Sequence, residues 1–284
     1  MSREKITIGR IMENKAKGLK MSRTALYDYP MAVLAEAAGL EIINVGDSIA
    51  SVMLGYENTL PAQLDLMVEH AKAVRRGAPT AFIMGDMPFL SYQISIEQAI
   101  ANAGRYIKEA GMDCVKVEGG LEIVPIIEAL TKASIPVIGH TGLTPQSAVM
   151  LGGYKAAGSS AEVACQLVKT VEAFDRAGCV AVTVEAVPVE VAKVLYARCS
   201  APMFGTGTGQ YTDAPFINIY DLLGFFEKVP RFAKTYANFR QEAVEAITAF
   251  KREITEGLYP TPANSYHMKE GEEAKFFKML ENQA

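Results

Sequence analysis

The chain has 284 residues, of which 28 are Lys or Arg and 32 are Asp or Glu, so its formal net charge is −4. Nucleic-acid binders need surplus basic residues to neutralise phosphates, and this balance excludes that class. Half of the residues are hydrophobic, which excludes a disordered chain. With no Trp, 8% aromatic residues and 23 Gly, the composition favours an aliphatic, closely packed α/β protein with many tight turns.

The sequence also argues against a membrane or secreted protein. Its longest apolar stretch, residues 179–197, contains Glu185, Glu190 and Lys193, and buried charges make a membrane span costly. The first 18 residues lack the apolar block of a signal peptide. The four Cys residues show no C-x-x-C pairing, so we expect reduced thiols in a cytoplasmic protein.

Short apolar runs alternate with helical stretches along the chain. Most runs are unbroken, which is typical of parallel strands covered on both faces. The expected strands are residues 19–25, 41–45, 80–84, 114–117, 136–139, 180–184, 202–205 and, with a weaker pattern, 216–220.

The segments between these runs show helical spacing. One example is the apolar stripe of Leu64, Met67, Val68 and Ala71. Helix starts are expected at Ser95 and Ser159, which are followed three residues later by Gln or Glu. Helix ends are expected just before Gly77, Gly111 and Gly178.

This alternation predicts an α/β protein built as a single (β/α)8 TIM barrel. Residues 1–18 would form an N-terminal helical extension and residues 19–236 the barrel. Residues 237–284 would add a long helix and a tail packed on the barrel. The alternative is a doubly wound sheet, but its Gly-rich turn is missing after the first strand, where ALYD stands at 25–28.

Five consecutive predicted strands end in ionisable residues. In a barrel these ends form the mouth where active sites lie. The residues are Asp47 with Ser48, Asp86, Lys116 with Glu118, His140 and Glu185. An isolated Asp after a strand is commonly a turn residue, but three grouped acids require a neutralising cation. Because these ligands are all oxygens, we predict Mg²⁺ bound by Asp47, Asp86 and Glu118.

The remaining charges suggest a reaction on a 2-oxo acid. Lys116 and Glu118 are two residues apart on one strand and therefore face the same way. Lys116 could bind a substrate carboxylate, or it could pair internally with Glu118. Glu185 follows an apolar strand and precedes an apolar segment. Burial among these residues would raise the pKa of Glu185 and make it a general base. His140 could handle protons or simply hold strand ends together. Such a site could form an enolate.

Several motifs together resemble one enzyme family. They are YDY (27–29), VGDS (45–48), AVRRGAP (73–79), DMPF (86–89), VKVEGG (115–120), GHTGLTPQ (139–146), GGYK (152–155), EAVP (185–188) and SYH (265–267). In this collinear order the sequence resembles the ketopantoate (3-methyl-2-oxobutanoate) hydroxymethyltransferases, of the phosphoenolpyruvate mutase/isocitrate lyase superfamily. It departs from that pattern at GTGTG (205–209), at DAP (213–215) and at Tyr56.

The resemblance implies a Mg²⁺-dependent barrel enzyme of pantothenate biosynthesis that forms a homo-oligomer, a decamer in this family. The substrate 3-methyl-2-oxobutanoate would contact Asp47, Ser48, Asp86 and Lys116, with Glu185 as proton acceptor. The cosubstrate would be 5,10-methylenetetrahydrofolate and the product 2-dehydropantoate. No nucleic-acid or membrane partner is implied.

Two other functions stay open on the sequence. A paralogue or C–C lyase of the same superfamily could act on another 2-oxo acid. Alternatively, the chain could be a non-catalytic scaffold or binding protein, although clustered carboxylates have little use without a metal.

Overall fold

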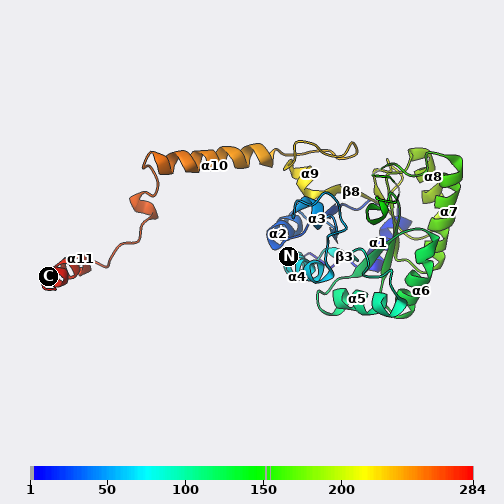
Figure 1. Ribbon diagram of the computed structural model, residues 1–284, viewed down its shortest axis with the longest axis horizontal. Coiled ribbons are helices and arrows are strands. Elements are labelled where there is room, and N and C mark those ends of the chain that lie inside the picture. The colour runs from blue at the N-terminus through cyan, green and yellow to red at the C-terminus, as the bar shows by residue number, and fades with distance from the viewer. Residues whose placement is uncertain (1–2, 151, 154, 284) are drawn as a thin grey trace. The chain divides into compact units, whose positions relative to one another are not determined.

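The computed structural model describes residues 3–150, 152–153 and 155–283 of the chain. Its eight strands are all parallel and close into a barrel in sequence order, with β8 paired to β1 (Figure 1). The (β/α)8 prediction is therefore confirmed. The strands are β1 (Arg23–Ala25), β2 (Ile42–Val45), β3 (Phe82–Asp86), β4 (Cys114–Glu118), β5 (Val137–Gly142), β6 (Ala181–Glu185), β7 (Met203–Thr206) and β8 (Ala214–Asn218).

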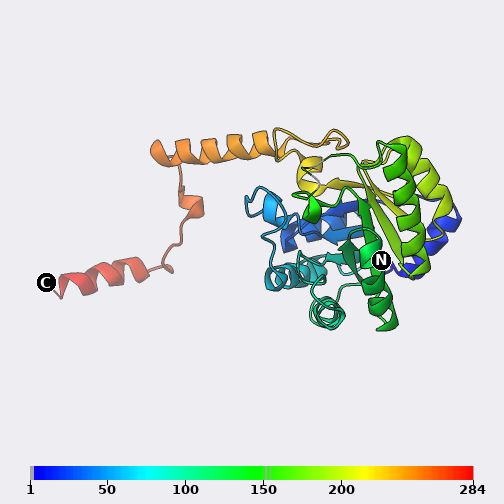
Figure 2. The same cartoon turned by 45° about the vertical axis from the view of Figure 1, so that its right-hand side comes forward.

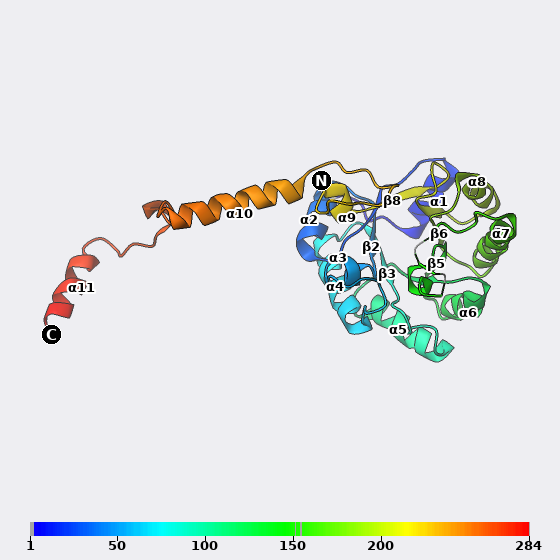
Figure 3. The same ribbon diagram turned by 45° about the horizontal axis from the view of Figure 1, so that its top comes forward.

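Helices surround this barrel, as Figure 3 shows most clearly. Residues 207–213, all of them described, join β7 to β8 without a helix. The α-helices of the barrel unit are α1 (Ile8–Ala16), α2 (Tyr29–Ala37), α3 (Ile49–Val52), α4 (Leu64–Gly77), α5 (Ile96–Lys108), α6 (Val124–Lys132), α7 (Ala161–Arg176), α8 (Val189–Arg198) and α9 (Ile219–Leu223). Two 3-10 turns, η1 (Leu121–Ile123) and η2 (Pro145–Ser147), complete it.

The expected helix starts are partly right. Ser95 caps α5 by accepting a hydrogen bond from the Gln98 amide. The cap of α7 is Ser160 rather than Ser159, because it is the Ser160 hydroxyl that accepts from the first turn. The eighth strand also stops early: Asn218 caps α9, which takes up the last two residues of the expected run 216–220.

Gly77 differs from its predicted role as well. Gly111 and Gly178 have φ of +63° and +91°, as expected just past a helix end. Gly77 instead belongs to α4. A Cβ there would lie 2.7 Å from the Ala32 Cβ of α2, so glycine allows these two helices to touch.

The barrel interior is built in levels. At the end where the strands begin, an apolar cluster closes the barrel and Ile11 of α1 packs into it; its strand members include Ile42, Met84, Cys114, Ile138, Ala181 and Phe204. Because side chains alternate along a strand, the residue two places further on also points inward. These next residues are Asn44, Asp86, Lys116, His140, Thr183 and Thr206. A polar level therefore stands directly on an apolar one.

Residues Ala237–Ala284 form a second compact unit, separate from Met1–Tyr236. It contains α10 (Phe239–Thr255), the 3-10 turn η3 (Pro262–Asn264) and α11 (Glu272–Glu281), which Figure 2 shows in chain order. Whether this unit packs on the barrel stays a prediction. No helix within the described residues is long and apolar enough to cross a membrane.

Candidate active site

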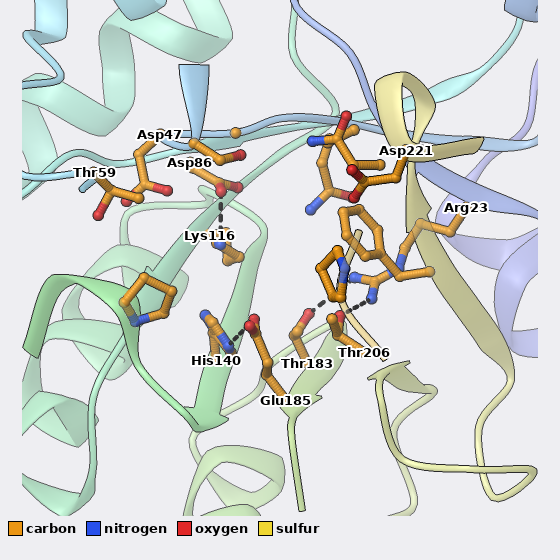
Figure 4. A pocket seen from close by; sticks show the side chains of 18 of the residues that line it. Arg23, Asp47, Thr59, Asp86, Lys116, His140, Thr183, Glu185, Thr206 and Asp221 are labelled. Carbon is orange, nitrogen blue, oxygen red and sulfur yellow. Dashed lines mark hydrogen bonds and ion pairs between the residues drawn. The ribbon is translucent and has the colours of Figure 1, made fainter. Parts of the chain in front are cut away.

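A cavity of about 170 Å³ opens at the carboxyl ends of the strands (Figure 4). Six of the residues predicted from strand ends line it: Asp47, Ser48, Asp86, Lys116, His140 and Glu185. Glu118, the seventh, is buried but is not one of the described lining residues. The barrel therefore brings together side chains that are almost 140 positions apart in sequence.

Asp47, Asp86 and Lys116 form what we call the acid end of the cavity. Lys116 Nζ lies 2.6 Å from Asp86 Oδ2, and both side chains are almost fully buried. Burial opposes the charge on Lys116, but the surrounding carboxylates raise its pKa above the ordinary value. Lys116 thus pairs with Asp86, rather than with Glu118 as the alternative had it.

The turn after β2 places Asp47 in this group. Gly46 permits the tight turn, since a Cβ there would lie 2.8 Å from Ser48 Oγ. Burial raises the pKa of Asp47 to about 7, despite the opposing charge of Lys116. A carboxylate in such surroundings needs a neighbouring cation to stay ionised at neutral pH.

Gln146 holds the acidic residues in place. Its Nε2 donates to Asp47 Oδ2 at 2.7 Å, and its backbone N–H donates to Glu118 Oε1 at 2.7 Å. Its Oε1 accepts from Tyr92 Oη at 2.9 Å. The predicted site residues did not include Gln146, because an amide within a loop motif carries no charge signal of its own.

Glu118, His140 and Glu185 form a row on adjacent strands. His140 Nδ1 lies 3.2 Å from Glu118 Oε2, and its Nε2 lies 3.4 Å from Glu185 Oε2. Burial and the charge of Lys116 oppose protonation of the imidazole, but the two carboxylates outweigh them and raise the pKa of His140. The row links the acid end to the proposed base.

The surroundings of Glu185 differ from those expected. Its side chain is 21% exposed and faces an imidazole, so apolar residues do not enclose it. The next residue, Ala186, has φ of +48°, an uncommon conformation for a residue with a side chain. Its N–H donates to Thr206 O and its carbonyl accepts from Ala157 N. The strained backbone at Ala186 fixes the position of Glu185 at the end of β6.

Ser48 is held by a second small network. Its hydroxyl lies 2.8 Å from Tyr27 Oη, which also accepts from Asn218 Nδ2 at 2.7 Å. Tyr27 is fully buried, so the network links the ends of β1, β2 and β8 beneath the cavity. Ser48 is thereby presented beside Asp47.

Arg23, Thr183 and Thr206 form what we call the arginine end. Arg23 is the first residue of β1 and is 4% exposed. Its Nη2 donates to Thr206 Oγ1 at 2.9 Å and its Nη1 to Thr183 Oγ1 at 3.4 Å. We did not predict Arg23 as a site residue: it lies at the amino end of a strand, and only its long side chain reaches the cavity. Thr206 belongs to the segment 205–209, where the sequence departs from the family pattern.

The acid end fits a hard cation. Within the described residues, Asp86 Oδ1 is buried and lacks a hydrogen-bond partner. No three His, Cys, Asp or Glu side chains in that part of the chain form a ready-made metal cluster. Mg²⁺ commonly takes only one or two carboxylates and completes its shell with water and substrate oxygens. Asp47 and Asp86 match this coordination preference.

The fold and the cavity define a (β/α)8 enzyme that acts on small molecules, with its site at the carboxyl ends of the strands. The chain belongs to the ketopantoate hydroxymethyltransferase family, whose model matches residues 5–262. It is thus a transferase, and the predicted resemblance is confirmed.

Similar proteins agree with this assignment. The chain is 42% identical to 3-methyl-2-oxobutanoate hydroxymethyltransferase of Heliobacterium modesticaldum over 266 residues, 93% of this chain and 96% of that one. It is 43% identical to the enzyme of the same name from Geobacillus kaustophilus over 259 residues, 91% and 93% of the two chains.

Solved structures share the fold at lower identity. Phosphonopyruvate hydrolase aligns with a TM-score of 0.59 and 14% identity over 98% of both chains. 2,3-Dimethylmalate lyase, a member of the PEP mutase/isocitrate lyase superfamily, aligns with a TM-score of 0.57 and 15% identity over 91% of this chain and 93% of its own. Tyr154 of the GGYK motif lies outside the described residues.

Proposed function

We propose that the chain transfers a hydroxymethyl group from 5,10-methylenetetrahydrofolate to 3-methyl-2-oxobutanoate, which gives 2-dehydropantoate for pantothenate biosynthesis. The observation that carries this proposal is one cavity that holds both the acid end and Glu185. A 2-oxo acid needs a cationic site for its oxygens and a base for its C3–H. The relatives reported above are named for hydroxymethyl transfer to 3-methyl-2-oxobutanoate.

Mg²⁺ is the proposed metal, with Asp47 and Asp86 as its ligands and Glu118 as the third. When bound, it supplies positive charge that stabilises an enolate. The unpartnered Asp86 Oδ1 and the raised pKa of Asp47 support this assignment. Glu118 is buried and is not one of the described lining residues, so its role as a direct ligand stays a prediction.

The substrate's carboxylate and ketone would lie at the acid end. Asp47, Ser48, Asp86 and Lys116 are the proposed contacts. Lys116 is the cation for the substrate carboxylate, because its ammonium lies at the cavity wall and its other partner is Asp86. Ser48 Oγ can donate to a substrate oxygen while it accepts from Tyr27.

Glu185 is the proposed general base. Its carboxylate removes the C3 proton, and the neighbouring His140 orients it and balances its charge. C3 then forms a bond to the methylene carbon of the folate. One of that carbon's two C–N bonds breaks as this C–C bond forms. Water supplies the oxygen of the new hydroxymethyl group as the second C–N bond breaks. The proton taken from C3 and one proton of the water go to the two nitrogens, and tetrahydrofolate leaves.

We also propose a cytoplasmic homo-oligomer, a decamer by resemblance to the family. Light scattering of the purified full chain tests this assembly: a mass near ten times 30.7 kDa supports it, and a monomer contradicts it.

The reaction itself is tested with purified protein, Mg²⁺ and both substrates, following 2-dehydropantoate by mass spectrometry. We expect product that depends on added Mg²⁺ and on the folate. If C3 exchanges its proton but no transfer occurs, the hydroxymethyl step is wrong and a superfamily lyase is favoured. If neither occurs, the enzymatic proposal fails.

A further inference from the structure

The arginine end of the cavity contains a buried cation that the proposed reaction does not use. Arg23 is held by two threonine hydroxyls, and its Nε has no hydrogen-bond partner in the described part of the chain. The rings of Phe204 and Phe216 lie 5.3 and 4.9 Å from its guanidinium carbon. These contacts fix the guanidinium in place but do not neutralise it.

A buried charge is ordinarily paired with an opposite charge. Among the described residues, no carboxylate lies within 4.0 Å of Arg23, whereas Lys116 has Asp86 at 2.6 Å. Burial lowers the pKa of Arg23 to about 9, and Glu185 and Asp86 support its charge from further away. The group is still protonated at neutral pH, and its guanidinium has no ion-pair partner among the described residues.

The position of Arg23 shows which part of a substrate it would face. Figure 4 places it across the cavity from Asp47 and Asp86, with Glu185 between the two ends. A 2-oxo acid with its carboxylate and ketone at the acid end, and C3 beside Glu185, directs its C3 substituent toward Arg23.

The walls around this substituent are polar too. Asn44 and Asn218 line the cavity. The methyl groups of 3-methyl-2-oxobutanoate would leave the Arg23 guanidinium without an ion-pair partner. An oxygen-rich substituent would supply hydrogen-bond acceptors, and a planar carboxylate matches a guanidinium best.

We propose that Arg23 forms a second anion subsite and that the enzyme binds 2-oxo dicarboxylic acids, with the distal carboxylate on Arg23. This inference rests on the proposed function, because it uses the same acid end and the same base. It names the substrate class that the cavity favours over branched aliphatic 2-oxo acids.

Binding calorimetry with Mg²⁺ tests this preference on matched pairs of compounds. Oxaloacetate is compared with 4-methyl-2-oxopentanoate, and 2-oxoglutarate with 5-methyl-2-oxohexanoate. Each pair has the same shape and differs in one carboxylate. We expect at least one dicarboxylate to bind about 10- to 100-fold more tightly than its apolar counterpart, the usual range for a charged hydrogen bond. Equal affinities within both pairs would overturn the proposal.

Variants of Arg23 assign the preference to this side chain. Arg23→Met should lose it and bind 3-methyl-2-oxobutanoate more tightly, because Met fills the space between two Phe rings without a charge. Arg23→Lys should keep part of the preference. Arg10→Met removes an exposed arginine of α1 and should change nothing. Thermal melting confirms that each variant is folded, and a preference that survives Arg23→Met contradicts the assignment.

The two proposals fail in distinguishable ways. If the wild type exchanges the C3 proton of 3-methyl-2-oxobutanoate but shows no preference for dicarboxylates, only the Arg23 subsite is wrong. If no 2-oxo acid undergoes exchange at C3, the proposed reaction is wrong as well.

Discussion

At the acid end of the cavity, Asp86 and Lys116 lie 2.6 Å apart and Asp47 accepts from Gln146, whereas at the arginine end a single guanidinium lies among hydroxyl groups. The acid end carries two carboxylates and one ammonium, a set that a divalent cation would complete. The arginine end carries one positive charge with no carboxylate within ion-pair distance in the described chain. Both ends contain buried side chains of the polar level of the barrel: Asp86 and Lys116 in the first, Thr183 and Thr206 in the second.

The difference between the two ends suggests that they have different roles in the reaction. The acid end suits the oxygens that every 2-oxo acid shares, so it serves the chemistry. The arginine end contacts the C3 substituent, which varies among 2-oxo acids, so it determines which substrate is bound. Four substitutions test this difference, and their expected effects decrease from Glu185→Gln to Arg23→Met.

Glu185→Gln should have the largest effect, because it removes the base that lies between the two ends. We expect solvent deuterium exchange at C3 of 3-methyl-2-oxobutanoate to fall about 10²- to 10⁴-fold, the usual contribution of a general base. The rate is measured by proton NMR. Glu190→Gln, on the exposed first turn of α8, is the matched control. Exchange at the wild-type rate in Glu185→Gln would show that another group is the base.

Lys116→Met should destabilise the acid end, since it leaves two buried aspartates without their cation. Removing one partner of a buried ion pair costs about 3–5 kcal/mol of unfolding free energy. Urea unfolding measures this loss, and added Mg²⁺ should restore more stability to the variant than to the wild type. Lys132→Met, which breaks an exposed pair with Glu128, should cost less than about 1 kcal/mol. Equal losses in the two variants would contradict the account of the acid end.

Gln146→Leu should weaken metal binding without removing a charge. The substitution leaves Asp47 without its amide donor, and residues that orient metal ligands typically contribute about 10- to 100-fold in affinity. Calorimetric titration with Mg²⁺ measures the change. Gln166→Leu on the exposed face of α7 should leave the affinity unchanged. A wild-type Mg²⁺ affinity in Gln146→Leu would show that Gln146 does not organise the site.

Arg23→Met should have the smallest effect on stability. Because the guanidinium is buried without a carboxylate, its replacement by an apolar side chain should change the free energy of unfolding by less than about 1 kcal/mol, or increase it. Urea unfolding measures this value. A loss above about 3 kcal/mol would mean that Arg23 supports the barrel rather than the substrate.

The barrel could be predicted because its strands carry a strong local signal. Runs such as residues 136–139 and 202–205 are continuously apolar, and parallel strands buried on both faces favour this pattern. The boundaries of β8 could not be predicted. Asn218 is the one polar residue of the run 216–220, and the hydrogen bond from the Tyr220 amide to its side chain shows that α9 begins inside the run.

The site was predictable where function depends on charges at strand ends. Asp47, Asp86, Lys116, His140 and Glu185 all line the cavity because the carboxyl ends of parallel strands meet at one mouth. Arg23 and Gln146 could not be found in this way. The first reaches the cavity from the opposite end of its strand, and the second acts through hydrogen bonds from a loop.

The most direct test of the central claim is C3 exchange by the wild-type enzyme in deuterated water with Mg²⁺ and without folate. The claim predicts that 3-methyl-2-oxobutanoate loses its C3 proton signal, and that a chelator stops the loss. Full retention of that signal with Mg²⁺ present would contradict the assignment of the acid end and Glu185 to enolate formation.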